Sequence, residues 1–380
     1  MKIIYFSLDY TPHDHRFLSA LAESEHEVFY VRLQRGARQT EGRPVPSEIH
    51  QVQWLGGRPD ASRLFVWRDV PALVWDFQRL IRTIKPDLVH AGPIQTCAFI
   101  ASLACAGTIP ILCMSWGFDL MKDVERGRWW RFATRYTLKH SNYFISDAYV
   151  TRDKAIAYGM QPDKTVVFPW GVDLSHFSPK ALHENGADSI YPNNPEQEGF
   201  TLFCNRSWEL NYGLDVLAKA FVIAAQQNPQ LSLLLLAGGS QGPVIRKILA
   251  DGGVMERVTF AGQIGQKELP YYYRMADLYI SASHVDGSSV SLMEALACGL
   301  PCLVSDIPAN KEWVIEDRNG WLFPDGDVNT LAAKILSAAE HRTDLPAIGL
   351  HARQTAEEKA NWPNNFKKLL AAYEETVKYA

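Results

Sequence analysis

The chain has 380 residues, of which 47% are hydrophobic, and its 38 basic and 42 acidic side chains give a net charge of −4. That length is enough for two domains of ordinary size, each with a core of its own. A charge so close to balance provides no global attraction for nucleic acid, so no nucleic-acid partner is predicted and any basic site must be local.

The first residues, MKIIYFSLDY, are typical of a strand and lack the charged start and long apolar run of a signal peptide. No segment reaches the ~18 to 20 uninterrupted apolar residues that span a bilayer. The six cysteines lie in apolar segments without a CxxC pair or a histidine at zinc-ligand spacing, so we predict buried thiols and no metal site. These features predict a cytoplasmic protein.

Short β-branched or aliphatic runs alternate with amphipathic stretches along the chain, which is typical of strand-helix-strand units on parallel sheets. In the first half the expected strands are KIIYFSL (2–8), EVFYVRL (27–33), DLVHAG (87–92), PILCMSW (110–116), YFIS (143–146) and TVVFP (165–169). In the second half they are TLFC (201–204), LSLLLLAG (231–238), VTFAG (258–262), LYISAS (278–283), PCLVSD (301–306) and GWLFP (320–324). The sequence therefore predicts an α/β fold with two parallel sheets.

The stretch SPKALHENGADSIYPNNPEQEGF, which ends at residue 200, has no periodicity and is rich in Pro, Asn, Glu and Gly, as linkers are. We expect an N-terminal domain over 1–175, a linker over 176–199 and a C-terminal domain over 200–362. The final helix, about 363–380, could return to either half. Ligands of open parallel sheets bind beyond the carboxyl ends of the strands, so the functional residues should lie in strand-to-helix loops.

The stretch HVDGSSVSLMEALACGLP (284–301) places a carboxylate on each side of a Gly-Ser loop. A helix is predicted to follow the loop and to end near Cys298, with Gly299 after its last turn. The free backbone N–H groups at the start of that helix suit a phosphate, and Gly287 lacks the Cβ that would obstruct its approach.

The second carboxylate of this stretch, Glu294, lies one to two turns into the expected helix. From there it can accept hydrogen bonds from a pair of neutral hydroxyls. The alternative is structural, because Ser291 and Glu294 have the S-x-x-E spacing of a capping box. The stretch alone does not decide between the two.

A second motif favours another enzyme class. AGGSQGP contains Gly238-x-Ser240-x-Gly242 after an expected strand, the position of a hydrolase nucleophile elbow, with His284, His341 or His351 as the base. The alternative, which we favour, is a glycine-rich turn that lets the backbone approach a ligand, because the chain has no HGGG-type oxyanion loop. No GxGxxG follows the first strand, which argues against a dinucleotide dehydrogenase.

A family resemblance carries more weight than these motifs. HVDGSSVSLMEALACGLPCLVSDIPANKEWVIEDRNGWLFPDGD (284–327) resembles the donor-binding segment of retaining GT-B glycosyltransferases of family 4, with Asp286-x7-Glu294 in place of the usual E-x7-E. SNYFISDAYVTRDKAIAYGMQPDKTVVFPWGVDLSHFSP (141–179) is similar to the family's interdomain approach, and VTFAGQIGQKELPYYYRMADLYISAS (258–283) to its nucleotide-side loop and following strand. The resemblance implies two Rossmann-like domains that face each other across a cleft.

By that resemblance, the C-terminal domain would bind a nucleotide sugar. Glu294 would hold the ribose hydroxyls, Asp286 would contact the transferred sugar, and Arg206 would bind the diphosphate as the family's arginine does. Donor-binding roles are implied for Arg206, Tyr212, Gly238, Gly239, Gln263, Ile264, Gly287, Ser288, Ser289, Val290 and Glu294. Fixed donors aimed at the leaving diphosphate would lower the barrier, because charge develops there as the glycosidic bond breaks.

The chain departs from the family pattern near the diphosphate. The lysine that usually follows the arginine is absent, and Asn211 or Tyr212 stands near its place. Neutralisation of the diphosphate would then be weaker unless Arg246, Lys247 or a base from the N-terminal domain contributes.

The N-terminal half departs as well. Trp116 stands where the family has the histidine of HG-x-[DE], although Gly117 and Asp119 remain, as in some polysaccharide-type members. The loop DYTPHDHRFL offers His13 and His15 instead, and a histidine titrates in the useful range, so both are catalytic candidates beside Asp286 and Arg206. Acceptor-side candidates are His90, Trp116, Gly117 and Asp119.

Retention in this family is thought to proceed by front-face attack, in which the leaving phosphate helps to take the acceptor proton. The resemblance therefore implies no protein nucleophile, no glycosidase-like carboxylate pair, and neither cofactor nor metal. The donor would be a UDP- or GDP-sugar, and the acceptor a glycan, a lipid-linked sugar or a small molecule. A sugar-nucleotide-binding protein without transfer activity is a further alternative.

Residues 126–140, RGRWWRFATRYTLKH, combine basic and aromatic side chains. At helical spacing, Arg128, Arg131, Arg135 and Lys139 share one face, and Trp129, Phe132, Ala133 and Tyr136 share another. Such a helix could rest on the anionic inner face of a membrane, as a peripheral contact. We favour the alternative, a domain helix whose aromatic side is core and whose arginines are solvated.

Overall fold

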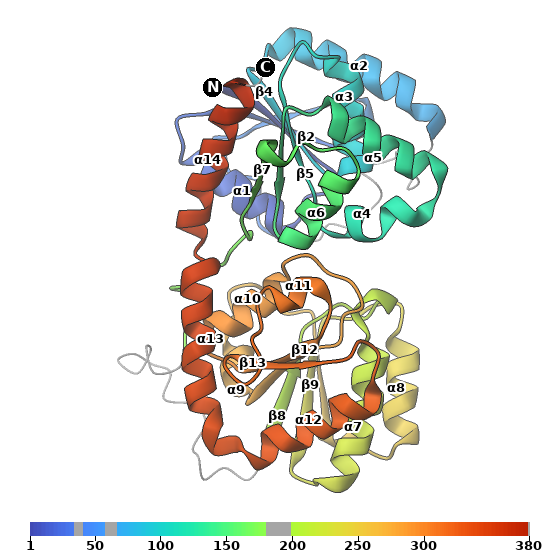
Figure 1. Cartoon of the computed structure of the whole chain (residues 1–380), viewed down its shortest axis with the longest axis vertical. Helices are drawn as coiled ribbons and strands as arrows, with labels where there is room; N and C mark the ends of the chain where they lie inside the picture. Colours follow the sequence, from blue (N-terminus) through green and yellow to red (C-terminus); the bar gives the residue numbers. More distant parts are fainter. Residues whose placement is uncertain (34–40, 58–66, 180–198, 379–380) are drawn as a thin grey trace. The chain divides into compact units, whose positions relative to one another are not determined.

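The fold is described from a computed structural model, for residues 1–33, 41–57, 67–179 and 199–378. The contacts divide the chain into two compact units, Met1–Pro169 with Pro363–Ala380, and Trp170–Trp362. Each unit is an α/β domain built on one parallel sheet with helices on both faces, as Figure 1 shows. The predicted α/β fold with two parallel sheets is therefore confirmed.

The first unit has a seven-stranded sheet in the order β3-β2-β1-β4-β5-β6-β7. Its strands are β1 (Lys2–Ser7), β2 (Glu27–Arg32), β3 (His50–Val52), β4 (Leu88–Ala91), β5 (Ile111–Met114), β6 (Tyr143–Ser146) and β7 (Thr165–Val167). Its helices are α1 (Pro12–Ala22), α2 (Val70–Ile84), α3 (Phe99–Cys105), α4 (Phe118–Met121), α5 (Arg128–His140), α6 (Tyr149–Ala157) and α14 (Trp362–Lys378). Strand β3 was not predicted, because its three residues are short of an apolar run.

Strand alternation divides the core of this unit into two layers. On one face of the sheet, Ile4 and Phe6 of β1 pack with apolar residues of α2 and α3. On the other face, Tyr5 packs against Phe17 of α1 and against His90, which in turn contacts Tyr373 of α14. The last helix of the chain thus covers the sheet that begins at the first residues (Figure 1).

The second unit has a six-stranded sheet in the order β10-β9-β8-β11-β12-β13. Its strands are β8 (Phe200–Cys204), β9 (Leu231–Leu236), β10 (Val258–Gly262), β11 (Leu278–Ser281), β12 (Cys302–Ser305) and β13 (Gly320–Phe323). Its helices are α7 (Leu214–Gln227), α8 (Gly242–Asp251), α9 (Leu269–Met275), α10 (Val290–Ala297), α11 (Pro308–Lys311), α12 (Val328–Glu340) and α13 (Leu345–Lys359). One core joins the sheet to α7, α8 and α12, and the other joins it to α9, α10 and α13.

The predicted end of the first domain at residue 175 and start of the linker at 176 differ from the structure. Residues from Trp170 onward pack with the second unit: the N–H of Val172 donates to the Ala360 carbonyl at 2.8 Å, and Phe177 is buried in the core that includes α10. Apolar side chains at these positions explain the difference, since they need a core to cover them. The remainder of the predicted linker, 180–198, lies outside the described residues.

The favoured interpretation of residues 126–140 is correct for Arg128, Arg131 and Arg135, which are exposed, and wrong for Trp129 and Phe132. The side of α5 that faces the core consists of Ala133, Thr134, Thr137 and Leu138, whereas Trp129 is 66% exposed. Of the predicted aromatic side, Ala133 is core and Tyr136 packs partly buried against it, whereas Trp129 and Phe132 are exposed because Thr134, Thr137 and Leu138 take the inner positions. No helix in the described part of the chain is both long enough and apolar enough to cross a membrane. All six cysteines are buried and free, as predicted.

Candidate active site

The loops at the carboxyl ends of the strands in the second unit gather most of the predicted donor-binding residues. Arg206 follows β8, Gly238 follows β9, Gln263 follows β10 and Asp286 follows β11. Because all strands of the sheet are parallel, these ends lie on one edge of it.

The loop that follows β11 leads directly into α10. Ser289 is the N-cap of the helix, and its side chain accepts a hydrogen bond from the Leu292 N–H at 3.4 Å. The alternative of a capping box formed by Ser291 and Glu294 is thus wrong, because the helix begins two residues earlier than that motif requires. The hydroxyl of Ser288 is held by Trp313, whose indole N–H donates to it at 3.0 Å.

The end of α10 is as predicted. Its C-cap is Cys298, and Gly299 follows with φ of +70°, a left-handed conformation that glycine adopts without strain. An α-helix of eight residues with ordered caps at both ends therefore presents its first N–H groups at the edge of the sheet.

Arg206 reaches across the start of α10. Its Nη1 donates to Ser289 Oγ at 2.7 Å and to Ser291 Oγ at 3.1 Å, and its Nη2 donates to Asp286 Oδ2 at 2.5 Å. The guanidinium also lies 4.2 Å from the ring centre of Tyr212. Its Nε is buried and has no hydrogen-bond partner among the described residues, which leaves one donor for a ligand.

Burial acts on both members of the Arg206–Asp286 pair. It lowers the pKa of the guanidinium, but Asp286 and neighbouring tyrosines raise it by more, so the pKa of Arg206 lies above its ordinary value. Burial raises the pKa of Asp286, and Arg206 and the Gly287 N–H offset only part of that rise. The carboxylate predicted to face the sugar is therefore bound to the arginine predicted to face the diphosphate.

Glu294 is only 2% exposed and has two hydrogen-bond donors aimed at it. Tyr273 donates its hydroxyl to Oε2 at 2.7 Å, and Gln266 donates its amide to Oε1 at 3.0 Å. The Tyr273 hydroxyl also accepts a bond from Asn205 at 2.8 Å. The amide oxygens of Asn205 and Gln266 are buried without a hydrogen-bond partner in the described structure.

Several residues of this site were missed from the sequence, among them Gln266, Tyr273 and Tyr279, and Ser291 was considered only as a helix cap. The Tyr279 hydroxyl donates to Ser291 Oγ at 2.8 Å, so a strand tyrosine fixes the serine that Arg206 contacts. The run of tyrosines in LPYYYRM was a signal, because a polar aromatic that is buried in a helix needs a partner for its hydroxyl.

The glycine-rich turn after β9 is hydrogen-bonded to the side chain of Glu209. Ser240 donates its hydroxyl to Glu209 at 2.5 Å and its N–H to the same carboxylate at 3.1 Å. A Cβ on Gly239 would come within 2.6 Å of the Trp208 carbonyl, so the turn requires glycine there. A carboxylate, not a histidine, is the partner of Ser240, so the hydrolase alternative lacks its base.

Two other residues predicted to bind the donor lie between β10 and α9. Gln263 is exposed in the loop after β10, and Ile264 packs against the core that includes α10. Arg246 and Lys247, the predicted substitutes for the family's phosphate-binding lysine, both lie on α8 and contact other groups. Lys247 pairs with Asp251 at 2.9 Å, and the guanidinium of Arg246 lies 3.9 Å from the centre of the Phe260 ring on β10.

In the first unit, His13 and Trp116 lie together, with perpendicular rings 5.8 Å apart between centres. His13 Nδ1 and Trp116 Nε1 are both buried without a hydrogen-bond partner among the described residues. Burial, with a smaller contribution from Arg16, lowers the pKa of His13 to about 3, so this imidazole is neutral near pH 7. His15 is held instead by the Tyr10 hydroxyl, at 2.7 Å from its Nδ1.

Asp119 fixes the loop after β5. It accepts hydrogen bonds from Ser115 Oγ at 2.6 Å and from the N–H groups of Trp116, Leu120 and Ile94 at 3.0 to 3.1 Å. Burial outweighs these bonds and raises its pKa to about 6. Gly117 adopts φ of +81° in this turn. The structure thus gives Asp119 a positioning role for Trp116.

His90 lies on β4 and is completely buried. Its Nδ1 lies 2.8 Å from the Tyr373 hydroxyl, and burial lowers its pKa to about 3. With no surface exposed to solvent, His90 does not match the predicted acceptor-side role. The reason is that α14, from the far end of the chain, covers this face of the sheet.

Two family profiles cover most of the chain. Residues 13–176 match the family described as Glycosyltransferase Family 4, and residues 199–341 match that described as Glycosyl transferases group 1. The chain belongs to glycosyltransferase family 4. The second match contains Arg206, Asp286 and Glu294, and the first contains His13 and Trp116.

Among curated relatives, an amylovoran biosynthesis glycosyltransferase of Erwinia amylovora is 29% identical over 41% of this chain and 40% of its own length. A D-inositol 3-phosphate glycosyltransferase of Jonesia denitrificans is 28% identical over 58% of this chain, which is 53% of that relative. The chain thus spans about half or less of these relatives. A GDP-mannose-dependent phosphatidylinositol monomannoside mannosyltransferase of Mycobacterium tuberculosis is 24% identical over 86% of this chain and 90% of its own.

Solved structures agree on the fold. Sucrose-phosphate synthase of Thermosynechococcus elongatus has a TM-score of 0.81 at 18% identity and covers 100% of both chains. Anabaena HepE in complex with UDP has a TM-score of 0.78 at 17% identity and covers 98% of this chain and 100% of its own. At such identities the likeness shows the GT-B fold of this family-4 chain and nothing more.

Proposed function

We propose that this protein transfers a sugar from a nucleotide-sugar donor to an acceptor hydroxyl, with retention of the anomeric configuration. The observation that supports the proposal best is the array around the start of α10. There a largely buried arginine with an unused Nε–H, a capped helix start and a buried carboxylate lie on one edge of a parallel sheet.

In the proposed reaction, the second unit holds the donor. The ribose hydroxyls bind Glu294, and the diphosphate binds Arg206 and the first N–H groups of α10. The bond between the sugar C1 and the diphosphate oxygen breaks, and the acceptor oxygen bonds to C1 on the same face. The acceptor proton passes to the leaving phosphate, whose growing charge Arg206 stabilises.

On the acceptor side, we propose that His13 and Trp116 contribute neutral hydrogen-bonding groups. Both have a buried nitrogen without a partner in the described structure, as is typical of groups that await a ligand. Because its pKa is about 3, His13 would orient a hydroxyl or a phosphate rather than supply positive charge.

The donor class follows from the same array. A nucleoside diphosphate sugar based on UDP or GDP offers the diol and the diphosphate that the array would bind. HepE was crystallised with UDP and with UDP-glucose, and the Mycobacterium tuberculosis relative depends on GDP-mannose. Relatives named for phosphatidylinositol monomannoside and for inositol 3-phosphate support a lipid-linked or small polyol acceptor, with a glycan as the further class.

A screen of UDP- and GDP-sugars by thermal shift, followed by release of nucleoside diphosphate with and without acceptors, tests the proposal. We expect the sugars of one nucleotide, UDP or GDP, to raise the unfolding temperature. The corresponding nucleoside diphosphate should be released when an acceptor is added. Binding without release, with every acceptor tried, would favour a sugar-nucleotide-binding protein. Ser240→Ala is the control: its transfer rate should equal that of the wild type, and loss of an esterase activity in this variant would favour the hydrolase.

A further inference from the structure

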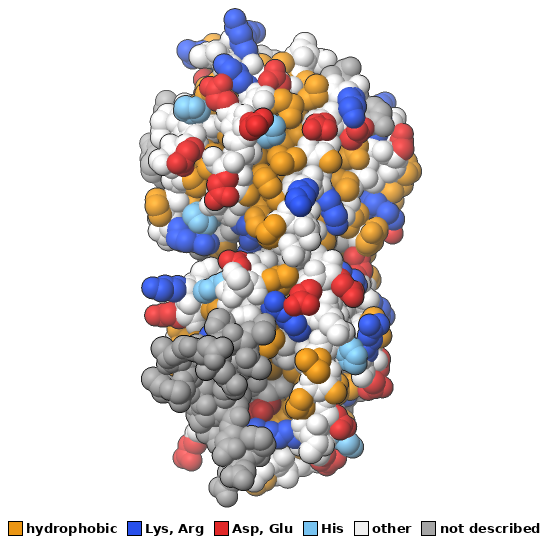
Figure 2. All heavy atoms as spheres, turned by 90° about the vertical axis from the view of Figure 1, so that its left-hand side faces the viewer, with side chains coloured by type: hydrophobic (Ala, Val, Ile, Leu, Met, Phe, Trp, Pro, Cys, Tyr) orange, Lys and Arg blue, Asp and Glu red, His pale blue; other side chains and the backbone are white. Residues whose placement is uncertain are grey.

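Helix α5 is locally basic in a chain that is acidic overall. Arg128–His140 contains four arginine and lysine residues and no aspartate or glutamate, whereas the net charge of the chain is −4. In the described structure only Arg131 of the four has an ion-pair partner, Glu125 at 2.5 Å. By contrast, basic and acidic side chains are interspersed on the side of each unit that Figure 2 shows.

The same helix exposes large aromatic side chains beside these cations. Trp129 is 66% exposed and Phe132 is 50% exposed. Their ring centres are 6.3 Å apart, Phe132 is 5.9 Å from Tyr136, and Tyr136 stacks on His140 at 4.0 Å. A continuous aromatic row thus runs along the helix, and its exposed members, Trp129 and Phe132, are in contact with water at a free-energy cost.

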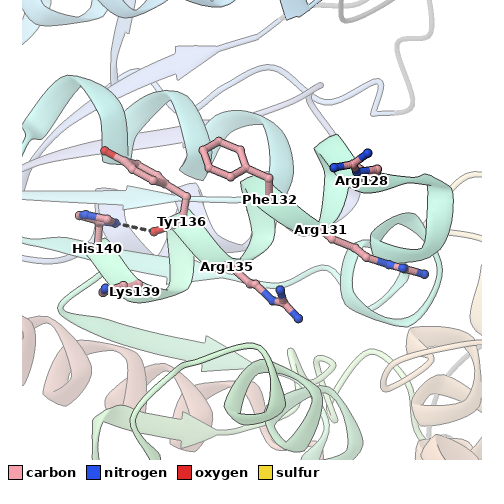
Figure 3. Close-up of a pocket in the computed structure, with 7 residues that line it drawn as sticks. All are labelled: Arg128, Arg131, Phe132, Arg135, Tyr136, Lys139 and His140. Atoms are coloured by element: carbon pink, nitrogen blue, oxygen red, sulfur yellow. Dashed lines mark hydrogen bonds between the residues drawn. The ribbon is translucent and has the colours of Figure 1, made fainter.

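The two kinds of side chain lie on adjoining flanks. In Figure 3, Phe132 and Tyr136 point to one side of α5, and Arg131 and Arg135 point to the other. Together with the remaining cations they line a shallow hollow of about 470 Å³. The helix therefore presents apolar area and positive charge to the same surroundings.

The opposite side of α5 fixes this arrangement. Gln95 donates to Thr134 Oγ1 at 2.9 Å, and Thr137 donates to the Ile94 carbonyl at 3.2 Å. Ala133 and Leu138 are buried in the core of the first unit. Since the helix is anchored along its buried side, the exposed row is displayed on a rigid element and does not depend on folding upon contact.

We propose that this side of α5 docks on a bilayer surface that contains anionic phospholipids. The exposed Trp129 and Phe132 suit the boundary between headgroups and acyl chains, and arginine and lysine suit the anionic headgroups. A soluble polyanion would satisfy the cations but would leave Trp129 and Phe132 in water. The proposal does not depend on the proposed reaction, because it concerns binding alone.

Cosedimentation of the full chain with lipid vesicles tests the proposed docking of α5. One set of vesicles consists of phosphatidylcholine alone, and the other of phosphatidylcholine mixed with phosphatidylglycerol. We expect binding to the mixed vesicles that weakens as salt is raised. The variant with Arg128→Gln, Arg135→Gln and Lys139→Gln should bind roughly a hundredfold more weakly, since each cation near the surface contributes about fivefold. The variant with Trp129→Gln and Phe132→Gln should bind more weakly at every salt concentration.

A matched control lies on α2, where Trp75 is 59% exposed and Arg79 lies over its ring at 5.0 Å. The variant with Trp75→Gln and Arg79→Gln should bind vesicles as the wild type does. Circular dichroism of all variants separates loss of binding from loss of folding. Equal losses in the control, or binding to soluble heparin with no dependence on Trp129 and Phe132, would overturn the proposal.

Discussion

The guanidinium of Arg206 holds three side chains at once, and this constrains how a donor can bind. A diphosphate that approaches α10 meets a cation whose terminal nitrogens already donate to Asp286, Ser289 and Ser291. The diphosphate must then share Arg206 with Asp286 or displace it. In the proposed reaction, Asp286 would therefore act on the donor through Arg206 as well as through its contact with the sugar.

Substitution of Asp286 by asparagine separates these two effects. We expect Asp286→Asn to lower the transfer rate on the order of a hundredfold, because the contact to the sugar loses its charge. Donor affinity should not fall, since the competitor for Arg206 is weakened. Isothermal titration with the donor and a product-release assay measure the two quantities, and an unchanged transfer rate would contradict the role of Asp286.

Glu294 should behave differently, because it accepts two fixed hydrogen bonds in a buried position. Glu294→Gln places an amide against Tyr273 or Gln266 and removes the charge that would attract the ribose hydroxyls. We expect donor affinity to fall about tenfold to hundredfold. Glu316→Gln, an exposed carboxylate on the same unit, is the control in the same titration, and equal affinities for the two variants would argue against a ribose contact.

At the scale of elements, the turn between β5 and α4 depends on one buried carboxylate. Asp119 ties this turn to the Ile94 N–H and sets the backbone of Trp116. One buried side chain thus holds two loops of the first unit together, and these hydrogen bonds satisfy the carboxylate of Asp119, which has no exposed surface.

The raised pKa of Asp119 predicts a specific dependence on pH. Its pKa of about 6 in the folded protein lies above the ordinary 3.8, so the folded protein binds this proton more tightly than the unfolded chain does. Its contribution to stability is fully present below about pH 4 and is lost as pH rises through 6. We expect the wild type to gain stability relative to Asp119→Asn as pH falls through this window, by at most about 1.4 kcal/mol per pH unit.

Chemical denaturation of the wild type and Asp119→Asn across that window measures the difference in the free energy of unfolding. Asp14, whose pKa burial also raises to about 6, is present in both proteins, so its contribution cancels from the difference. A difference that does not change with pH would show that Asp119 is ionised in the fold throughout.

At the scale of the whole molecule, the two units carry different kinds of site. The second has charged groups and a helix start, and the first has the neutral pair His13 and Trp116 and the basic helix α5. Such a division suits a donor with a diphosphate on one unit and an acceptor on the other.

The charge of Arg206 and the start of α10 also predict that no divalent metal is needed. We expect the transfer rate to be the same with and without EDTA, measured as nucleoside diphosphate release after exhaustive dialysis. A rate that EDTA abolishes and Mg²⁺ restores would contradict this.

The sequence by itself determined the parallel strands, the loop before α10 and the family. Apolar runs of four to six residues indicate strands that are buried on both faces of a sheet. The residues from Asp286 to Gly299 predict a loop and a helix by local rules alone, so the strands and this segment could both be predicted without knowledge of distant contacts. Glu294 and Arg206 could be named as candidates because their neighbours in the chain resemble a family.

Only the tertiary structure decided which groups meet. Arg206 and Asp286 are 80 residues apart, Gln266 and Glu294 are 28 apart, and His90 lies against Tyr373 across 283 residues. Periodicity tells which side of a strand or helix is buried, but the partner depends on strand order and on which helix covers which face. For the same reason, only the fold showed that the small side of α5 is the buried one and that Trp129 and Phe132 are left exposed.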